Sequence, residues 1–341
     1  MTNRGRLLRV GLAALCVAAA PAWAADQVLN LYSARHYQTD EALYSDFEKA
    51  TGIKINRIEG VDDQLIERIR SEGANSPADV FLTVDAARLQ YADMLGLFAP
   101  VKSPVLEQRI PANLRTPNWF AFSIRARLIV YNKMLAKKEE LQTYEDLANP
   151  RLKGKICTIS GSYPYNLSLG AALLAHDGEA ATESWVKGFV ANFARAPKGG
   201  DTDQLLSVGA GECAVTVSNS YYYARLMRSS NPKDRKAAES LAIVWPNQNT
   251  WGTHINVSGG GMLKNAPHKE AAAKFLEYLA SDSAQTYFAD GNNEWPVVRT
   301  ARFKNPALKG LGEFKQDDLP LGTIAKNVIP AQKIYDRAGF M

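Results

Sequence analysis

Tyrosine is the residue type whose placement in this sequence could do chemistry. Tyr221 to Tyr223 are consecutive, and they directly follow an apolar stretch that predicts a strand. Tyr165 has the same kind of position, between a predicted strand and a predicted helix. Tyr37 repeats this position a third time, with His36 beside it. Three separate strand-to-helix junctions therefore carry a phenol group, and one of them adds an imidazole.

Phenol oxygens at such junctions suit a hard trivalent cation. A phenol has an ordinary pKa of about 10, so phenolates are rare at neutral pH unless something displaces the proton. A bound Fe³⁺ does so, and oxygen ligands suit a hard ion. A helix N-terminus, which carries roughly half a positive charge, also favours the phenolate.

The charge of such a site needs an arginine nearby. Three phenolates neutralise Fe³⁺, and a fourth leaves one negative charge. Arg35, Arg125 or Arg127 could offset that charge, or could hold an anion that completes the coordination sphere. Arg125 and Arg127 are two residues apart in a predicted strand, so they share a face.

Each of these residues also has a purely structural interpretation. A single tyrosine such as Tyr165 can be a core or cleft aromatic, His36 can cap a helix, and the two strand arginines can be solvated charges. The tyrosine triplet is harder to explain by packing, because a helix start cannot bury three neighbouring side chains on one side. The remaining histidines have no metal-ligand spacing, and we interpret them as structural: His176, His254 and His268.

The first 24 residues predict a cleaved export signal. A basic start with three arginines precedes an apolar run, Val10 to Ala20, and a small-x-small cleavage site at residues 22–24. The run is shorter than the roughly 20 residues that a membrane span needs. Cys16 lies in it, but the bulky Leu15 disfavours a lipid anchor. We therefore expect free export to the periplasm and a mature chain that starts near Ala25.

Composition and motifs exclude several classes of protein. Loss of the signal lowers the formal net charge of +5 by three, which leaves no electrostatic case for nucleic acid or an anionic membrane. The sequence contains no zinc-ligand spacing, Walker loop, GxSxG elbow or HExxH motif, so we expect no enzyme. The two cysteines of the mature chain, Cys157 and Cys213, predict a disulfide in an oxidising compartment.

Short apolar strands alternate with amphipathic helices along the chain. This order predicts an α/β fold with mainly parallel sheets. One helix is expected after Thr39, whose side chain should cap it, one at 63–71 and one at 268–279. The predicted strands are 27–32, 54–58, 78–83, 119–131, 154–160, 214–218 and 256–263.

The order of the elements predicts two lobes. The strand at 119–131 is long enough to leave a first lobe and enter a second. We expect lobe 1 to comprise residues 25–124 and 246–292, and lobe 2 to comprise 125–245 and 293–341. Crossing segments of this kind leave a cleft, where α/β proteins usually bind ligands.

Five segments resemble the ligand segments of periplasmic ferric-ion-binding proteins of ABC importers. The resemblance is closest to the branch with His-Tyr in the first lobe and three tyrosines in the second. One departure is Trp295, which stands where many relatives have tyrosine. The segments occur in order over nearly the whole mature chain: Tyr32 to Tyr37, Tyr165 to Leu169, Asn219 to Tyr222, Ile255 to Gly261 and Asn293 to Val297.

The resemblance implies a type II periplasmic binding fold with a hinge between its lobes. It implies phenolate ligands at Tyr37, Tyr165, Tyr221 and Tyr222, and a fifth, less constant ligand at His36. Tyr223 falls beyond the ligand pair. The protein would capture ferric iron as a monomer, with carbonate or water completing the coordination, and deliver it to a permease in the inner membrane.

Two other functions stay open. A binding protein of the same fold for an organic cation or small anion, such as a polyamine or thiamine, would use the tyrosines as an aromatic cage. That function requires acidic residues in the cleft. A periplasmic metallohydrolase would need an open metal position and a general base, and no Asp or Glu is placed for the latter.

Overall fold

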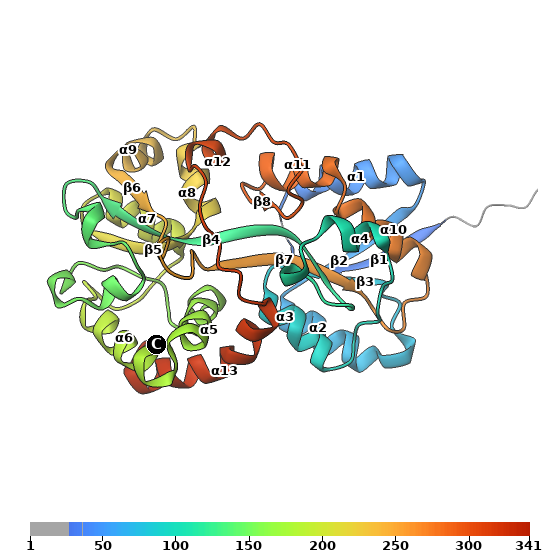
Figure 1. The fold of residues 1–341 in the computed structure, drawn as a ribbon. Coiled ribbons are helices and arrows are strands. Elements are labelled where there is room, and N and C mark those ends of the chain that lie inside the picture. Colours follow the sequence, from blue (N-terminus) through green and yellow to red (C-terminus); the bar gives the residue numbers. More distant parts are fainter. Residues whose placement is uncertain (1–26, 36) are drawn as a thin grey trace, which may run out of the picture.

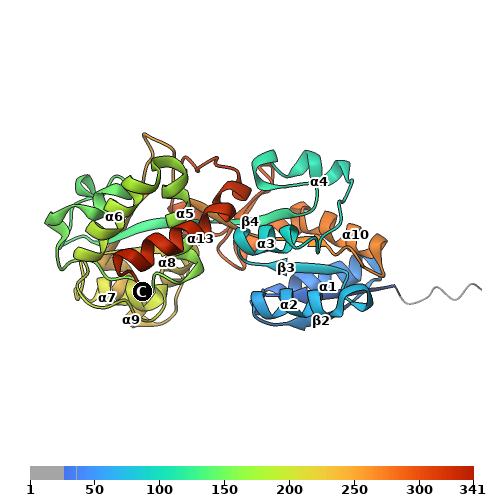
Figure 2. The ribbon, with the colours of Figure 1, turned by 90° about the horizontal axis from the view of Figure 1, so that it is seen from below.

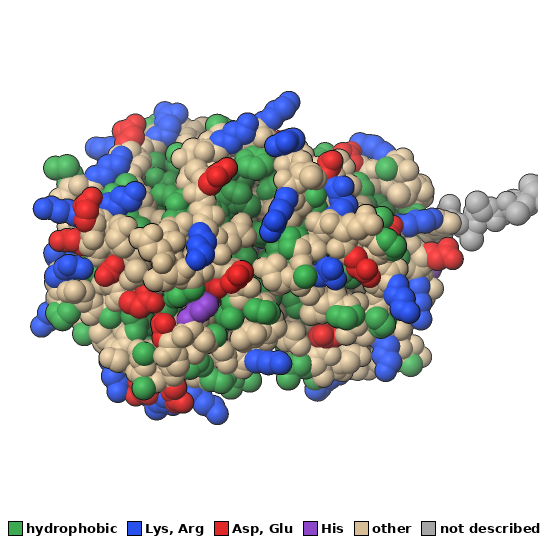
Figure 3. Space-filling view, in the orientation of Figure 1, with side chains coloured by type: hydrophobic (Ala, Val, Ile, Leu, Met, Phe, Trp, Pro, Cys, Tyr) green, Lys and Arg blue, Asp and Glu red, His purple; other side chains and the backbone are tan. Residues whose placement is uncertain are grey.

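The computed structural model describes residues 27–35 and 37–341, which form two lobes joined by long strands (Figure 1). The predicted export signal at residues 1–24 and the candidate ligand His36 lie outside the described residues. In the part of the chain that is described, no helix is long and apolar enough to cross a membrane. Basic and acidic side chains are interspersed over the face in Figure 3, as the near-neutral charge balance predicts.

Lobe 1 begins with three short strands and the helices between them. β1 (Val28–Ser33) pairs in parallel with β2 (Lys54–Glu59) and with β3 (Val80–Thr83). α1 (Asp40–Thr51) and α2 (Asp62–Glu72) connect them, each burying one apolar face. The predicted elements of this part are confirmed, with boundaries that differ by one or two residues.

Two strands run between the lobes in opposite directions. β4 (Phe120–Asn132) leaves lobe 1, and β7 (Ile255–Met262) returns to it. The first half of β4 pairs antiparallel with β7, and its second half pairs antiparallel with β5 (Val215–Asn219) and β6 (Leu241–Val244). The sheet is therefore mixed, and the prediction of mainly parallel pairing is wrong. Among the described strands, parallel ladders are limited to β1–β2 and β1–β3, because β4 and β7, which cross between the lobes, pair antiparallel with their neighbours.

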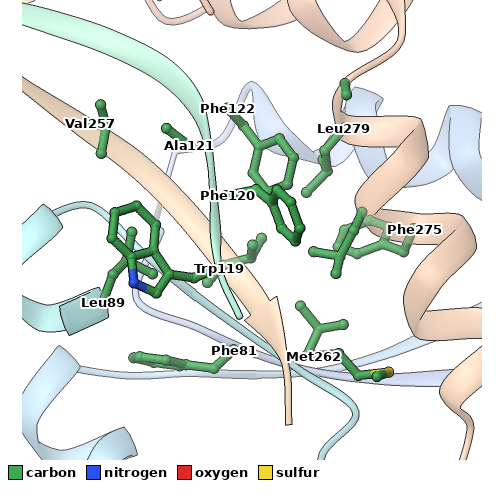
Figure 4. Close-up of a cluster of buried hydrophobic side chains, with 14 of the residues drawn as sticks. Phe81, Leu89, Trp119, Phe120, Ala121, Phe122, Val257, Met262, Phe275 and Leu279 are labelled. Carbon is green, nitrogen blue, oxygen red and sulfur yellow. The ribbon is translucent and has the colours of Figure 1, made fainter. Parts of the chain in front are cut away.

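The middle of β7 lies close to its neighbours because it consists of glycine. A Cβ added at Gly260 would overlap the side chain of Leu82 and the backbone oxygen of Phe81. Large aromatic side chains, among them Trp119 and Phe120, fill the space around this strand in the core of lobe 1 (Figure 4). The close approach places β7 between β3 and β4, where it ties the return segment to lobe 1.

Lobe 2 is built around the second half of β4. A disulfide joins Cys157 to Cys213, with Cα atoms 5.8 Å apart, which confirms the predicted pair. The predicted strand at 154–160 is wrong in extent, since within it only Ile156 forms β-bridges, to Phe193 and Val215. Thr158 instead accepts a hydrogen bond from Lys198, in an irregular segment, so no ladder continues beyond Ile156.

After β7 the chain forms two helices in lobe 1 and then crosses between the lobes again. α10 (Lys269–Leu279) and α11 (Asp282–Asp290) belong to lobe 1, and β8 (Trp295–Pro296) pairs with β4 at Ser123. Trp295 meets Trp245 and Phe314 edge-on, with ring centroids 5.8 and 5.3 Å apart. This tryptophan therefore packs in an aromatic cluster.

The segment that follows β8 contributes to both lobes. Val297 and Val298 pack in the hydrophobic cluster of lobe 1, whereas Leu308 of α12 (Pro306–Gly310) packs in a cluster of lobe 2. The predicted division of the lobes at residue 293 stays a prediction.

The last helix, α13 (Leu321–Ala338), lies along lobe 2, and its first turns reach lobe 1 (Figure 2). Leu321 and Ile324 belong to the hydrophobic cluster of lobe 1, and Ile334 and Tyr335 belong to that of lobe 2. Pro330 lies inside the helix and removes one backbone donor. The remaining α-helices are α3 (Ala86–Met94), α4 (Pro104–Arg109), α5 (Pro164–Asp177), α6 (Glu179–Ala191), α7 (Asp201–Gly209), α8 (Ser220–Met227) and α9 (Pro232–Ser240).

Candidate metal centre

The candidate tyrosines stand at helix starts, as the sequence predicts. Tyr165 is the second residue of α5, and Tyr221 and Tyr222 are the second and third residues of α8. α8 follows β5 without a connecting residue, so the end of the strand fixes the backbone positions of these two tyrosines. Tyr37 lies between β1 and α1. The predicted strand-to-helix junctions are therefore confirmed for Tyr37 and for the pair Tyr221 and Tyr222, whereas Tyr165 follows an irregular segment that contains only an isolated bridge at Ile156.

The structure brings these four tyrosines together. They line one cavity of about 450 Å³ between the lobes. The Tyr221 hydroxyl donates a hydrogen bond to the Tyr165 oxygen at 3.3 Å, and the rings of Tyr221 and Tyr222 lie 4.2 Å apart. The other lining residues are Gln38, Thr39, Val84, Arg225, Gly291, Asn292 and Asn293.

Tyr223 does not line this cavity. Its side chain is buried in a hydrophobic cluster of lobe 2 that also contains Leu226. Within the first turn of α8 the triplet therefore divides, with two phenols in the cavity and one in the core. Thr39 also differs from the prediction: its side chain does not cap α1 but bonds Asn292, across the cavity wall.

Burial favours the protonated form of three phenols of the cavity. Removal from water raises the pKa of Tyr37, Tyr221 and Tyr222 above the ordinary phenol value. The carboxylate of Glu294 raises the pKa of Tyr37 further, while the guanidinium of Arg125 opposes this effect. At neutral pH these three phenols therefore become phenolates when a cation replaces the proton.

The three predicted arginines lie behind the tyrosines. The guanidinium carbon of Arg35 is 4.9 Å from the ring centroid of Tyr37. Those of Arg125 and Arg127 are 5.9 and 5.8 Å from the rings of Tyr221 and Tyr165, respectively. All three arginines are buried. They form a basic layer around the phenol cluster.

Each of these arginines is paired with a buried carboxylate. Arg35 binds Asp40 at 2.8 Å, and Arg125 binds Glu294 at 2.9 Å. Arg127 binds Asp201 at 2.9 Å. The basic layer is therefore largely neutralised by its own partners, and the predicted role of these arginines in offsetting the charge of a metal site, or in holding an anion, stays a prediction.

The carboxylates and one further cation, Arg225, were not predicted from the sequence. Arg225 lines the cavity, and its guanidinium carbon lies 5.8 Å from the ring of Tyr221 and 5.5 Å from that of Tyr222. Within the described part of the chain, Arg225 forms no ion pair. It follows Tyr221 by four residues on α8, and this helical spacing is a signal that could have identified it.

The histidines that are described have other partners. His176 contacts Asp317, His254 contacts Ser168, and His268 contacts Asp79. Over residues 27–35 and 37–341, no three His, Cys, Asp or Glu side chains come together as a metal site. The side-chain oxygens that line the described cavity belong to phenols, to amides and to the hydroxyl of Thr39.

Comparison with known proteins points to one family. The chain matches the family described as bacterial extracellular solute-binding protein over residues 42–314. It is 50% identical to iron uptake protein A1 of Synechocystis sp. over 316 residues, which cover 92% of this chain and 88% of that protein. It is 46% identical to iron uptake protein A2 of the same organism, over 96% of this chain and 95% of that protein.

Solved structures agree with these relatives. The Trichodesmium protein IdiA (FutA), in complex with iron and citrate, has a TM-score of 0.88 and 53% identity, covering 92% of this chain and all of that one. The ferric binding protein of Campylobacter jejuni has a TM-score of 0.86 and 44% identity, with coverage of 92% and 100%. These comparisons confirm the type II periplasmic binding fold and the resemblance to ferric-ion-binding proteins. The chain belongs to the bacterial extracellular solute-binding proteins.

Proposed function

We propose that this protein captures ferric iron in the cleft between its lobes and delivers it to an ABC permease. The observation that carries the proposal is the meeting of four phenols, from three separate segments at or next to helix starts, in one cavity. We assign Tyr37, Tyr165, Tyr221 and Tyr222 as phenolate ligands, with His36 as a fifth. Phenolate oxygens match the hardness and charge of Fe³⁺.

The charge of the cavity supports the same cargo. A ferric ion with four phenolates carries one net negative charge, and Arg225 is positioned at the cavity wall to offset it. The three buried arginines behind the tyrosines already have carboxylate partners. We therefore assign the main compensating role to Arg225, and a positioning role to Arg35, Arg125 and Arg127.

The remaining coordination position is open to a small oxygen ligand. Carbonate or water would fit it, and a structural relative was solved with citrate beside its iron. The relatives are uptake and binding proteins, so we propose no enzymatic activity for this chain. Export to the periplasm, action as a monomer and docking on an inner-membrane permease complete the proposal.

A second candidate is the binding of an organic cation, because thiamine-binding periplasmic proteins are also relatives, at 24% and 25% identity. An aromatic cage for a cation needs acidic residues at its wall. The described residues that line the cavity include no Asp or Glu, and they include Arg225. Phenols become negative when a metal ion displaces their protons, and the positive charge of Arg225 stabilises them in that state. This lining therefore favours a metal ion over an organic cation.

A visible spectrum tests the proposal. The purified protein, freed of metal and then titrated with a ferric salt, should develop a red or orange phenolate-to-Fe³⁺ charge-transfer band that saturates at one ion per chain. Calorimetry with thiamine and with spermidine is the comparison. Strong binding of either organic cation, with no coloured complex, would replace the iron assignment by the second candidate.

A further inference from the structure

The helix that carries Tyr165, α5, packs against α13. The phenol of Tyr335, on α13, is buried and donates a hydrogen bond to the backbone oxygen of Asn166 at 2.8 Å. Its ring lies against Gly170 one turn further along α5, where any side chain would overlap it. Tyr335 therefore contacts the backbone of the residue next to Tyr165.

Asn166 is fixed by its side chain as well. Its amide oxygen accepts a hydrogen bond from Arg127 at 2.9 Å, and its amide nitrogen donates to the backbone oxygens of Ile159 and Ser160 at 3.1 and 3.0 Å. These contacts bind the first turn of α5 to β4 and to the segment that enters the helix. The hydrogen bond from Tyr335 adds a contact between the same turn and α13.

α13 is itself anchored on both lobes. Its first turns pack in the core cluster of lobe 1, and its last turns pack in lobe 2 (Figure 2). Near its end, Arg337 binds Glu179 and Glu183 of α6 at 2.9 and 2.7 Å. The helix thus presents the Tyr335 hydroxyl from a fixed position.

We infer that Tyr335 is a positioning residue for Tyr165. The inference rests on the proposed function, in which Tyr165 is a metal ligand. Tyr165 lines the cavity, and the backbone of residues 165 and 166 sets the position from which its ring and oxygen extend. Metal sites tolerate displacements of a few tenths of an ångström in ligand distance. Loss of the Tyr335 bond would let the first turn of α5 move by more than that.

Tyr335→Phe is the test variant, and Tyr278→Phe is its matched control. The Tyr278 hydroxyl also donates to a backbone oxygen, that of Leu43 in lobe 1, at 3.1 Å. Each variant loses one phenol-to-carbonyl hydrogen bond and keeps its ring, so both should fold, as circular dichroism and thermal unfolding would verify. Only Tyr335→Phe should affect the cavity.

The first measurement uses metal-free protein. 3-Fluorotyrosine is incorporated at position 165 alone, and the ¹⁹F NMR signal is recorded in the wild-type, Tyr335→Phe and Tyr278→Phe backgrounds. We expect the signal to shift or broaden in Tyr335→Phe and to stay unchanged in Tyr278→Phe. An unchanged signal in Tyr335→Phe would overturn the inference, whatever the iron data show.

The second measurement uses iron-loaded protein. The rate of iron transfer to an excess of a strong chelator should rise about 2- to 10-fold in Tyr335→Phe, the factor that corresponds to one hydrogen bond, with a shifted charge-transfer band. Equal rates and equal bands in both variants would contradict the positioning role. A wild-type protein without the band would overturn the proposed function, while the fluorine spectra would still decide whether Tyr335 positions the ring.

Discussion

The hydroxyl of Tyr221 donates a hydrogen bond to the oxygen of Tyr165 at 3.3 Å, although 56 residues separate the two. The disulfide between Cys157 and Cys213 spans the same separation, 56 residues. Each cysteine stands eight residues before its tyrosine. The disulfide and the hydroxyl contact therefore join the same two segments, residues 157–165 and 213–221. The disulfide joins their starts within lobe 2, and the hydroxyl contact joins their ends at the cavity.

Removal of a single ligand oxygen should weaken iron binding without unfolding the protein. Tyr221→Phe and Tyr222→Phe keep the ring, and each should reduce ferric affinity by at least about 100-fold, since loss of an indirect partner of a metal already costs 10- to 100-fold. The charge-transfer band should fade or shift. Tyr223→Phe is the matched control, because its ring is buried in the core of lobe 2. Unchanged spectra in the first two variants would remove both residues from the ligand set.

Iron binding should release protons. Burial raises the pKa of Tyr37, Tyr221 and Tyr222, so these phenols are protonated in the metal-free protein at neutral pH. Each phenol that becomes a ligand loses its proton, so lowering the pH favours release of the metal. Titration with ferric salt in buffers of different ionisation enthalpy would count the protons. A release of none would contradict phenolate ligation.

The same pKa shifts make the metal-free protein sensitive to alkali. A raised phenol pKa means that above about pH 10 the folded state binds more protons than the unfolded state, so the free energy of unfolding falls as pH rises. Below pH 10 these phenols are neutral in both states and contribute no pH dependence. Thermal unfolding between pH 8 and 11 should show a steeper loss in wild type than in Tyr221→Phe. Parallel curves would show that Tyr221 does not contribute.

We expect Arg225 to affect ferric affinity more than the stability of the metal-free protein. Its side chain is exposed, and Arg225→Gln should leave the melting temperature of the metal-free protein nearly unchanged. The variant should lower ferric affinity by about 5- to 30-fold, because a compensating charge at the wall is lost. Arg235→Gln, on the exposed surface of α9, is the control and should bind iron like wild type. Equal affinities of the two variants would exclude charge compensation by Arg225.

Loss of the disulfide should destabilise lobe 2. The chain-entropy relation for a loop of this size gives about 4 kcal/mol. The double variant Cys157→Ala, Cys213→Ala should unfold at a correspondingly lower urea concentration. Thiol titration of the unfolded, non-reduced wild type checks the bridge directly. Two free thiols there would contradict it.

Iron should hold the lobes together. Tyr37 lies in lobe 1, whereas Tyr165, Tyr221 and Tyr222 lie in lobe 2, so an ion bound to both sets favours the closed arrangement. Small-angle scattering at neutral pH should give a smaller radius of gyration for the iron-loaded form. Mild acid with a chelator should restore the larger value. Identical radii in both forms would mean that the lobes do not close on the metal.

The sequence by itself determined the local part of this protein. Apolar periodicity and turn residues act over a few positions, so they predicted β1 to β4, α1, α2 and α10 with small boundary errors. The positions of Tyr165, Tyr221 and Tyr222 at helix starts followed from the same local pattern. The pattern failed at 154–160, because whether an apolar segment forms a strand depends on its neighbour, and that neighbour is irregular.

Only the tertiary structure decided which distant groups meet. Arg125 is 169 residues from Glu294, and Tyr335 is 169 residues from Asn166, so no local signal links either pair. Whether an arginine in a strand is free or neutralised, and whether a phenol faces a cavity or the core, depends on how the lobes pack. Burial then sets the protonation state, because a buried charge is stable only beside a partner. For this reason the sequence could propose the phenols, while the packing of the two lobes determined the electrostatic environment in which they act.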